Sequence, residues 1–136
     1  MLKDMFVEMA KGRETPASGR IRELVARYLA TFATGDIEGR VALFAPDASF
    51  EDPVGTSPMI GHDALRAFFS QGSAMKMSAE LDRIAICGNE AAYAFRARLD
   101  AGEGGQVTIH PFETLVVGDD GLIVQMRAYF DAGSIS

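Results

Sequence analysis

Residues 21–32 have the hydrophobic spacing of an amphipathic helix. Their apolar positions recur at intervals of three and four residues and form one stripe, made of Ile21, Leu24, Val25, Tyr28, Leu29 and Phe32. Gly35 follows as a candidate C-terminal cap. Because the stripe needs an apolar surface to cover it, we expect this helix to lie against a sheet formed later in the chain.

The next segments predict two shorter helices with a strand between them. Asp36 is a candidate N-cap for a short helix that ends before Pro46. The apolar residues of this helix are Ile37, Val41, Leu43 and Phe44. Residues 48–52 predict a short strand, which Pro53 ends. A third helix begins near residues 61–63, and its apolar residues are Leu65, Phe68 and Phe69.

From residue 75 onward the hydrophobic period changes from 3.6 to 2, which is typical of strands. Strands are predicted at about residues 75–87, 91–100, 106–118 and 122–131. The segments between them are rich in turn-forming residues, so neighbouring strands can pair as hairpins. Helices followed by a meander of antiparallel strands predict an α+β fold, in which a curved sheet encloses a pocket.

The length and composition are those of one globular domain. The 136 residues are 48% hydrophobic and 24% charged, and we assign residues 19–136 to a single domain. Residues 1–18 form either a loose arm or a short extra helix. No apolar run approaches the roughly 20 residues that span a bilayer, and no signal peptide is recognisable. We therefore expect a cytoplasmic protein.

Charge and rare residue types argue against several kinds of partner. With 19 acidic and 13 basic residues the net charge is -6, which disfavours nucleic acid and anionic membranes. The single cysteine, Cys87, has no partner for an internal disulfide. The two histidines, His62 and His110, make a poor zinc set. We predict no metal and no cofactor.

Three polar residues stand where apolar residues are expected. Tyr28 carries the only hydroxyl of the first helical stripe, and a buried phenol needs a hydrogen-bond partner. Asp52 ends the short strand. Glu113 falls on the apolar face of its strand, together with Val107, Ile109, Leu115 and Val117. A carboxyl group in that setting tends to stay protonated, because burial disfavours its charged form.

Each of these residues also has an ordinary explanation. A tyrosine in a helical stripe is usually part of the core. An aspartate before a proline, as at Asp52, commonly only shapes a turn. A bulge near Pro111 would shift the register of the strand and turn Glu113 to solvent.

Taken together, these features resemble the ketosteroid isomerases, which lie within the NTF2-like (SnoaL-like) superfamily named after nuclear transport factor 2. The resemblance covers residues 21–130 approximately. Its matching segments are Ala26-Arg27-Tyr28, Gly35-Asp36-Ile37-Glu38, Glu51-Asp52-Pro53-Val54-Gly55, Gly61 and Met126-Arg127-Ala128-Tyr129-Phe130. It implies a cone in which three N-terminal helices pack in a strongly curved antiparallel sheet.

The resemblance also implies an enzyme and the roles of its residues. Steroid Δ-isomerases move a double bond into conjugation with a ketone, converting a Δ5 to a Δ4 3-oxosteroid. Asp52 matches the general base of the family, and Tyr28 matches the phenol that donates to the C3 oxygen. Glu113 matches a protonated Asp, the second donor of the oxyanion hole.

The chain departs from the better-known ketosteroid isomerases at three positions. Two tyrosines that support the oxyanion tyrosine are replaced by Phe44 and Phe69, and Glu113 is one methylene longer than Asp. A hydrophobic, steroid-like small molecule is the expected ligand. The expected pocket walls are Phe44, Val54, Phe69, Phe95, Leu115, Met126 and Phe130.

Two other functions stay open. A dehydratase, polyketide cyclase or epoxide hydrolase on this fold would need a His–Asp pair or an Asp–Arg–Asp set in the cavity. The strand alternation turns His110, Arg96 and Arg98 away from it. A non-catalytic binding module would have Asp52 paired with an arginine and shielded from any ligand.

The outward sheet face mixes polar and aromatic residues, which suits a subunit contact. We therefore predict a homodimer formed through this face. The residues expected there are His110, Phe112, Thr114, Gln125, Arg127 and Tyr129.

Overall fold

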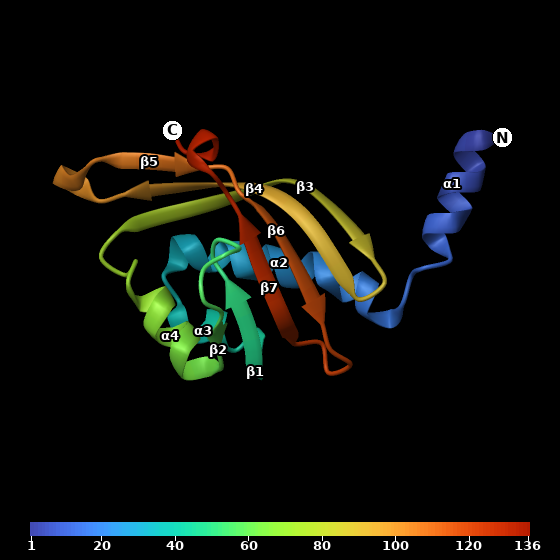
Figure 1. Ribbon diagram of the computed structural model, residues 1–136, viewed down its shortest axis with the longest axis horizontal. Helices are drawn as coiled ribbons and strands as arrows, with labels where there is room; N and C mark the ends of the chain where they lie inside the picture. The colour runs from blue at the N-terminus through green and yellow to red at the C-terminus, as the bar shows by residue number, and fades with distance from the viewer.

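A strongly curved sheet wraps around a long helix in the computed structural model, which describes residues 1–136 (Figure 1). The helices are α1 (Leu2–Lys11), α2 (Pro16–Thr34), α3 (Ile37–Val41) and α4 (His62–Ser70). The strands are β1 (Phe44–Glu51), β2 (Met59–Ile60), β3 (Lys76–Cys87), β4 (Glu90–Asp100), β5 (Gln106–Ile109), β6 (Phe112–Val117) and β7 (Ile123–Tyr129). Two 3-10 turns are η1 (Gly102–Gly104) and η2 (Ala132–Ser134). The predicted α+β class is confirmed.

The sheet has the strand order β2-β1-β7-β6-β4-β3, and β5 also pairs with β4. Pairing is antiparallel except between β1 and β7, which run parallel. The prediction of a wholly antiparallel sheet is therefore corrected at one seam. Parallel pairing is possible there because β1 and β7 lie far apart in the chain and no tight hairpin joins them.

Helix α2 begins and ends where its sequence signals lie. Pro16 occupies the first turn, and Gly35 closes the helix in the left-handed conformation at φ 67°. The Gly35 N–H donates to the Thr31 carbonyl at 2.9 Å. The helix packs against β3 and β4. Its stripe is buried as predicted, through Ile21, Leu24, Val25, Tyr28 and Leu29.

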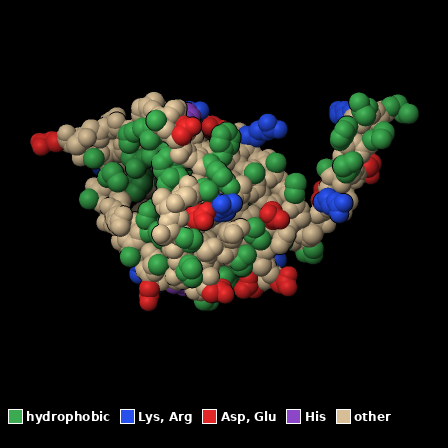
Figure 2. Space-filling model, viewed as in Figure 1, with side chains coloured by type: hydrophobic (Ala, Val, Ile, Leu, Met, Phe, Trp, Pro, Cys, Tyr) green, Lys and Arg blue, Asp and Glu red, His purple; other side chains and the backbone are tan.

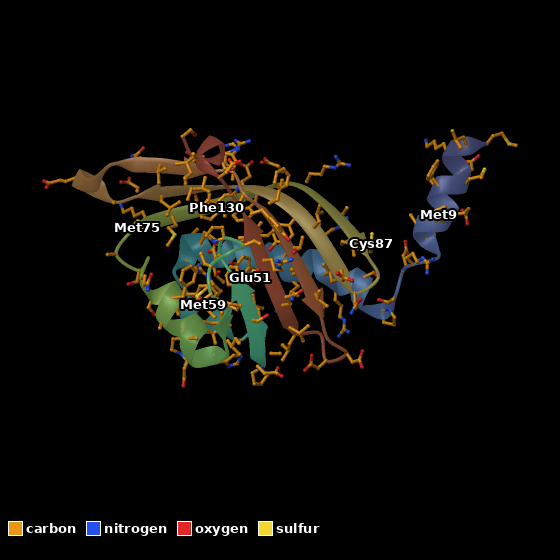
Figure 3. All side chains as sticks on the ribbon, in the orientation of Figure 1. Met9, Glu51, Met59, Met75, Cys87 and Phe130 are labelled. Atoms are coloured by element: carbon orange, nitrogen blue, oxygen red, sulfur yellow. The ribbon has the colours of Figure 1, made fainter.

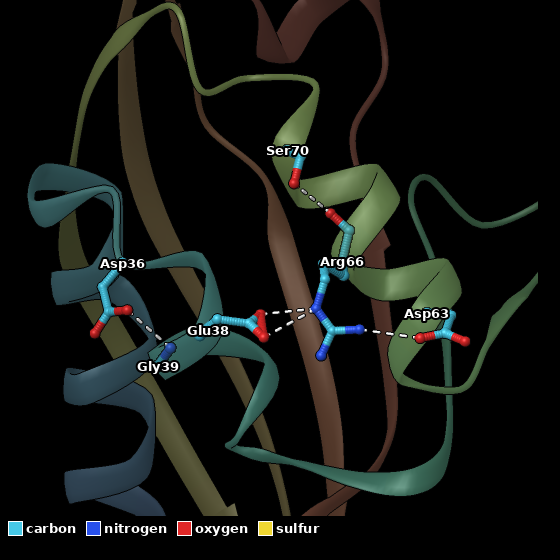
Figure 4. Close-up of polar contacts among 6 residues, drawn as sticks. All are labelled: Asp36, Glu38, Gly39, Asp63, Arg66 and Ser70. Atoms are coloured by element: carbon cyan, nitrogen blue, oxygen red, sulfur yellow. Dashed lines mark hydrogen bonds and ion pairs between the residues drawn. The ribbon is translucent and has the colours of Figure 1, made fainter.

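Helix α3 is shorter than the sequence predicts. The Asp36 side chain caps it by accepting a hydrogen bond from the Gly39 N–H at 2.9 Å (Figure 4). The helix ends at Val41, and Phe44, predicted as its last apolar residue, begins β1 instead. Phe44 pairs with Ile123 of β7. A long-range strand pairing therefore overrides the local helical pattern.

The strand predicted at 106–118 is divided into β5 and β6. The break falls at His110 and Pro111, because proline has no N–H to continue the ladder. β5 pairs with the second half of β4, and β6 pairs with its first half. The alternation within β6 is as predicted, with Glu113, Leu115 and Val117 buried.

Helix α1 stands away from the rest of the molecule (Figure 1). None of its residues is buried, although its apolar side chains include Leu2, Met5, Phe6 and Met9. No helix in the chain is both long enough and apolar enough to cross a membrane. The fold proper is thus built from α2 to η2.

Candidate active site

A cavity of about 490 Å³ opens between the helices and the curved sheet. Twelve of its 18 lining residues are hydrophobic. In Figure 2 the surface is hollowed at the end away from α1, and hydrophobic side chains gather in the hollow. This volume is within the range of about 300–1,000 Å³ that is typical of small-molecule sites.

The structure brings Tyr28, Asp52 and Glu113 to this one cavity. Tyr28 comes from α2, Asp52 directly follows β1, and Glu113 lies in β6. The three residues are therefore positioned by three separate elements, and the apolar wall surrounds them. The bulge that would have turned Glu113 to solvent does not occur, since its side chain is inside.

Glu113 is 3% exposed and accepts a hydrogen bond from the Tyr93 hydroxyl, with 2.6 Å between that oxygen and Oε1. The pKa of Glu113 is raised to about 8, mainly by burial. The Tyr93 hydrogen bond and the Arg40 charge oppose this rise, and the Asp52 charge adds to it. At neutral pH this carboxyl is therefore mostly protonated. Because Oε1 already accepts from Tyr93, Oε2 is left to carry the proton.

Tyr93 is a residue whose contribution the sequence analysis missed. It lies on β4 directly opposite Glu113 and is buried. Its inward alternation was visible in the sequence, but its partner depends on the register between β4 and β6. A hydroxyl on the inner face of a strand was the available signal.

Asp52 has a different environment from Glu113. Burial raises its pKa to about 6, and its carboxyl makes no hydrogen bond or ion pair within the protein. Its neighbour Glu51 pairs instead with Arg127, at 2.8 Å between Oε2 and Nε. Asp52 is therefore ionised at neutral pH and free to accept a proton from a ligand.

The Tyr28 phenol remains protonated at neutral pH. Burial, and then the charge of Glu113, raise its pKa well above the ordinary value. The side chain is 2% exposed and packs edge-on against Phe32 and Phe44, with ring centroids 5.7 and 6.1 Å away. Its hydroxyl has no protein hydrogen-bond partner, since phenylalanines stand where supporting tyrosines were expected from the resemblance.

The structure places three of the seven predicted wall residues at the cavity. Phe69, Phe95 and Phe130 line the cavity, and Figure 3 labels Phe130 together with Met75, another lining residue. The remaining predicted wall residues do not line it: Phe44, Leu115 and Met126 are fully buried in the core, and Val54 borders a separate shallow hollow. Strand alternation identifies the inner face but not how far along the strand the packed core gives way to open cavity.

Several lining residues were not predicted. They come from the loop before β3, from the open ends of β3 to β6 and from the helices, and include Phe32, Phe68, Met75, Met77, Leu99, Ile109 and Pro111. Methionine and aromatic side chains at such a mouth provide an adaptable apolar surface.

Arg40 of α3 also lines the cavity, and the sequence analysis missed it. It is 4% exposed, its Nε donates to the Thr31 hydroxyl at 2.8 Å, and it makes no ion pair. Its guanidinium lies over the rings of Phe32 and Phe69, at 4.6 and 4.8 Å from their centroids. Its burial could have been predicted from its position three residues after Ile37, which places it on the apolar side of α3.

The residues that would mark other chemistries lie outside the cavity. His110 is exposed and does not line it, so it forms no pair with Asp52. Arg96 pairs with Asp82 on the outer side of the β3–β4 hairpin, at 3.2 Å. Arg40 is thus the arginine that accompanies the two cavity acids.

Comparisons with known proteins agree with this architecture. Residues 25–126 match a protein family described as the SnoaL-like domain. A steroid Delta-isomerase of Nocardioides simplex is 36% identical over 118 residues, covering 87% of this chain and 95% of that protein. The epoxide hydrolase LasB of Streptomyces lasalocidi is 30% identical over 91% of this chain, which spans 52% of LasB.

Two solved structures superimpose with a TM-score of 0.78 each. One is SalBIII, described as an epoxide hydrolase/cyclase-like enzyme in pyran ring formation in the polyether salinomycin. It is 25% identical, and the match covers 85% of this chain and 93% of SalBIII. The other, RV0760c from Mycobacterium tuberculosis, is 23% identical over 90% of this chain and 98% of that one, and it shares the fold.

Proposed function

The chain belongs to the SnoaL-like domain family of the NTF2-like fold, and from this premise we propose that it is a ketosteroid isomerase-like enzyme. Its reaction would move a double bond into conjugation with a ketone on a hydrophobic, steroid-like substrate. The observation that carries the proposal is the meeting of Tyr28, Asp52 and Glu113 in one apolar cavity.

In the proposed reaction the Asp52 carboxylate removes a proton from the carbon between the carbonyl and the alkene. The electron pair of that C–H bond moves toward the carbonyl oxygen, which becomes the oxyanion of a dienolate. Tyr28 and protonated Glu113 donate hydrogen bonds to this oxygen. Asp52 then returns the proton farther along the conjugated system, so that substrate and product have the same composition.

The separation of the two acid pKa values supports these roles. Asp52, with a pKa of about 6, is a base above that pH, and Glu113, with a pKa of about 8, is a donor below that pH. Both required forms coexist between these values. When the surroundings of two carboxyl groups give them different pKa values, the group with the lower pKa can act as the base and the other as the acid.

The test is direct. We expect the protein to convert 5-androstene-3,17-dione to its conjugated enone, followed by absorbance, with activity highest between about pH 6 and 8. Activity should fall on the acid side as Asp52 gains a proton and on the alkaline side as Glu113 loses one. Absence of enone formation throughout this range would contradict the proposal.

One observation favours a second candidate, an epoxide hydrolase or cyclase. Arg40 joins Asp52 and Glu113 in the cavity and provides the acid–arginine–acid combination that such chemistry calls for. Neutral Glu113 would protonate the epoxide oxygen as its C–O bond breaks. Asp52 would accept the proton of the attacking water or hydroxyl group. Opening of a hydrophobic epoxide, with no isomerisation of the steroid, would favour this candidate.

We also propose that the protein is a homodimer formed through the outer face of β6 and β7. Phe112 is 65% exposed there and lies opposite the half-exposed Tyr129. An aromatic pair surrounded by polar side chains is typical of an interface core. Sedimentation velocity should show a dimer that Phe112→Asp converts to a monomer, and a monomeric wild type would refute the proposal.

A further inference from the structure

Two arginines on neighbouring helices differ in their surroundings. Arg66 of α4 has a side chain that is 41% exposed, and it pairs with Glu38 and Asp63 at 2.8 and 3.0 Å (Figure 4). Arg40 of α3 is 4% exposed and has no acidic partner within ion-pair distance. Arg66 thus has the usual surroundings of a charged surface residue, and Arg40 does not.

A buried cation without a partner is costly, so its place needs a reason. Of the five N–H donors of Arg40, the one on Nε binds the Thr31 hydroxyl, and the Nη groups have no hydrogen bond within the protein. The aromatic faces of Phe32 and Phe69 hold the guanidinium in position. Since Arg40 lines the cavity, its unpaired positive charge faces the space in which a ligand would bind.

Arg40 lies near the oxyanion side of the cavity. Its guanidinium carbon is 5.8 Å from the centroid of the Tyr28 ring. Its charge lowers the pKa of Tyr28 and of Glu113, in both cases against the larger, raising effect of burial. The raised pKa of Asp52 is due to burial. Arg40 therefore acts electrostatically on the two donors.

Proton abstraction moves a negative charge across this site. Before it, the charge is on Asp52, and after it Asp52 is neutral and the charge is on the ligand oxygen held by Tyr28 and Glu113. A fixed cation beside the two groups that hold the second charge stabilises the intermediate more than the bound substrate. Such a difference lowers the barrier of the step.

We propose that Arg40 is the cationic member of the oxyanion site, stabilising negative charge on the ligand oxygen that Tyr28 and Glu113 bind. In the better-known ketosteroid isomerases two tyrosine hydroxyls support the oxyanion tyrosine, and here Phe44 and Phe69 replace them. The charge of Arg40 would provide the missing stabilisation of the oxyanion. The cavity is accordingly selective for planar ligands that can be bound as oxyanions, namely dienolates, phenolates and naphtholates. This inference rests on the proposed isomerase function for its catalytic meaning.

The experiment uses 2-naphthol, whose absorbance distinguishes the neutral from the ionised form without any turnover. At about 6 Å and an effective dielectric constant of about 20, an opposite charge favours an oxyanion by roughly 10²-fold. Together with the donors Tyr28 and Glu113, this charge should outweigh the opposing charge of Asp52, so that wild-type protein ionises bound 2-naphthol at a lower pH than water does. Arg40→Met should raise the pH of half-ionisation by about 1–2 units.

Two variants accompany Arg40→Met. Arg66→Met, a matched change on the exposed face of α4, should leave the ionisation of the bound naphthol unchanged. Arg40→Lys keeps the charge and should recover most of the shift. If Arg40→Met does not fold, Arg40→Gln removes the same charge and keeps a side-chain N–H for the Thr31 hydroxyl, and its titration decides the question.

The outcomes separate this inference from the proposed function. Wild-type protein that binds 2-naphthol only in its neutral form, or not at all, overturns the inference, as does an Arg40→Met titration equal to that of wild type. If the enone is formed, those results do not contradict the proposed isomerase function. Conversely, a naphtholate shift that depends on Arg40, found without isomerisation, supports the oxyanion site and refutes the isomerase.

Discussion

Replacing Asp52 with Asn should lower kcat for the isomerisation of 5-androstene-3,17-dione by about 10²–10⁴-fold, the usual contribution of a positioned base. The amide has nearly the same shape but cannot accept the proton. Affinity for a phenolic steroid should be retained, because such a ligand is bound through Tyr28 and Glu113. Initial rates and equilibrium binding measure the two effects separately.

A matched variant in the preceding strand makes this result specific. Asp47 lies within β1, before Asp52, and is exposed, so Asp47→Asn should leave both turnover and binding unchanged. Normal turnover by Asp52→Asn would show that another group is the base. Loss of binding together with turnover would indicate that Asp52 shapes the cavity rather than acting on the substrate.

Two substitutions of Glu113 should differ sharply in their effect on turnover. Glu113→Leu removes a donor and leaves the Tyr93 hydroxyl without its acceptor, so kcat should fall by about 10²–10³-fold. Glu113→Gln keeps an N–H donor and an acceptor for Tyr93, and should retain more activity. It should also lose the alkaline limb of the pH profile near pH 8, because an amide does not ionise.

The same group makes stability depend on pH. The pKa of Glu113 is raised from about 4.3 in the unfolded chain to about 8 in the folded protein. Its stabilising contribution is therefore complete below about pH 4.3 and is lost as pH rises through about 8. Relative to Glu113→Gln, the wild type should lose up to about 5 kcal/mol of unfolding free energy across this range.

Urea unfolding of both proteins at several pH values measures that difference. Glu103→Gln, on the exposed η1 turn, serves as the control and should follow the wild type. Parallel stability profiles for wild type and Glu113→Gln would mean that the Glu113 carboxyl ionises normally. That result would also remove the case for a protonated donor at this position.

Local patterns were sufficient for the features that depend on one element. The stripe of α2 placed Tyr28 on a buried face, and the alternation of β6 placed Glu113 inside. The position of Asp52 at the end of a strand was also visible, since proline follows it. The inward placement of Tyr28 and Glu113 could be predicted because each lies on an element whose inner face is identified by its own hydrophobic period.

Features that depend on two distant elements were missed. Phe44 was predicted in a helix but lies in β1, where it pairs with β7. The sequence around Phe44 contains no local signal for this parallel pairing. Tyr93 donates a hydrogen bond to Glu113 because the register between β4 and β6 places the two residues opposite each other. Arg40 was overlooked because a charged residue in a five-residue helix is ordinarily a surface residue, and its aromatic neighbours come from α2 and α4.

The active site can form during folding only after β1 has paired with β7. Asp52 is flanked by contacts to β7: Glu51 pairs with Arg127, and the Val54 N–H donates to the Ala128 carbonyl at 2.8 Å. Both contacts join residues more than seventy positions apart, which makes their closure a late and slow event in folding. A nascent chain can therefore form its helices early and remain inert until its final strand docks.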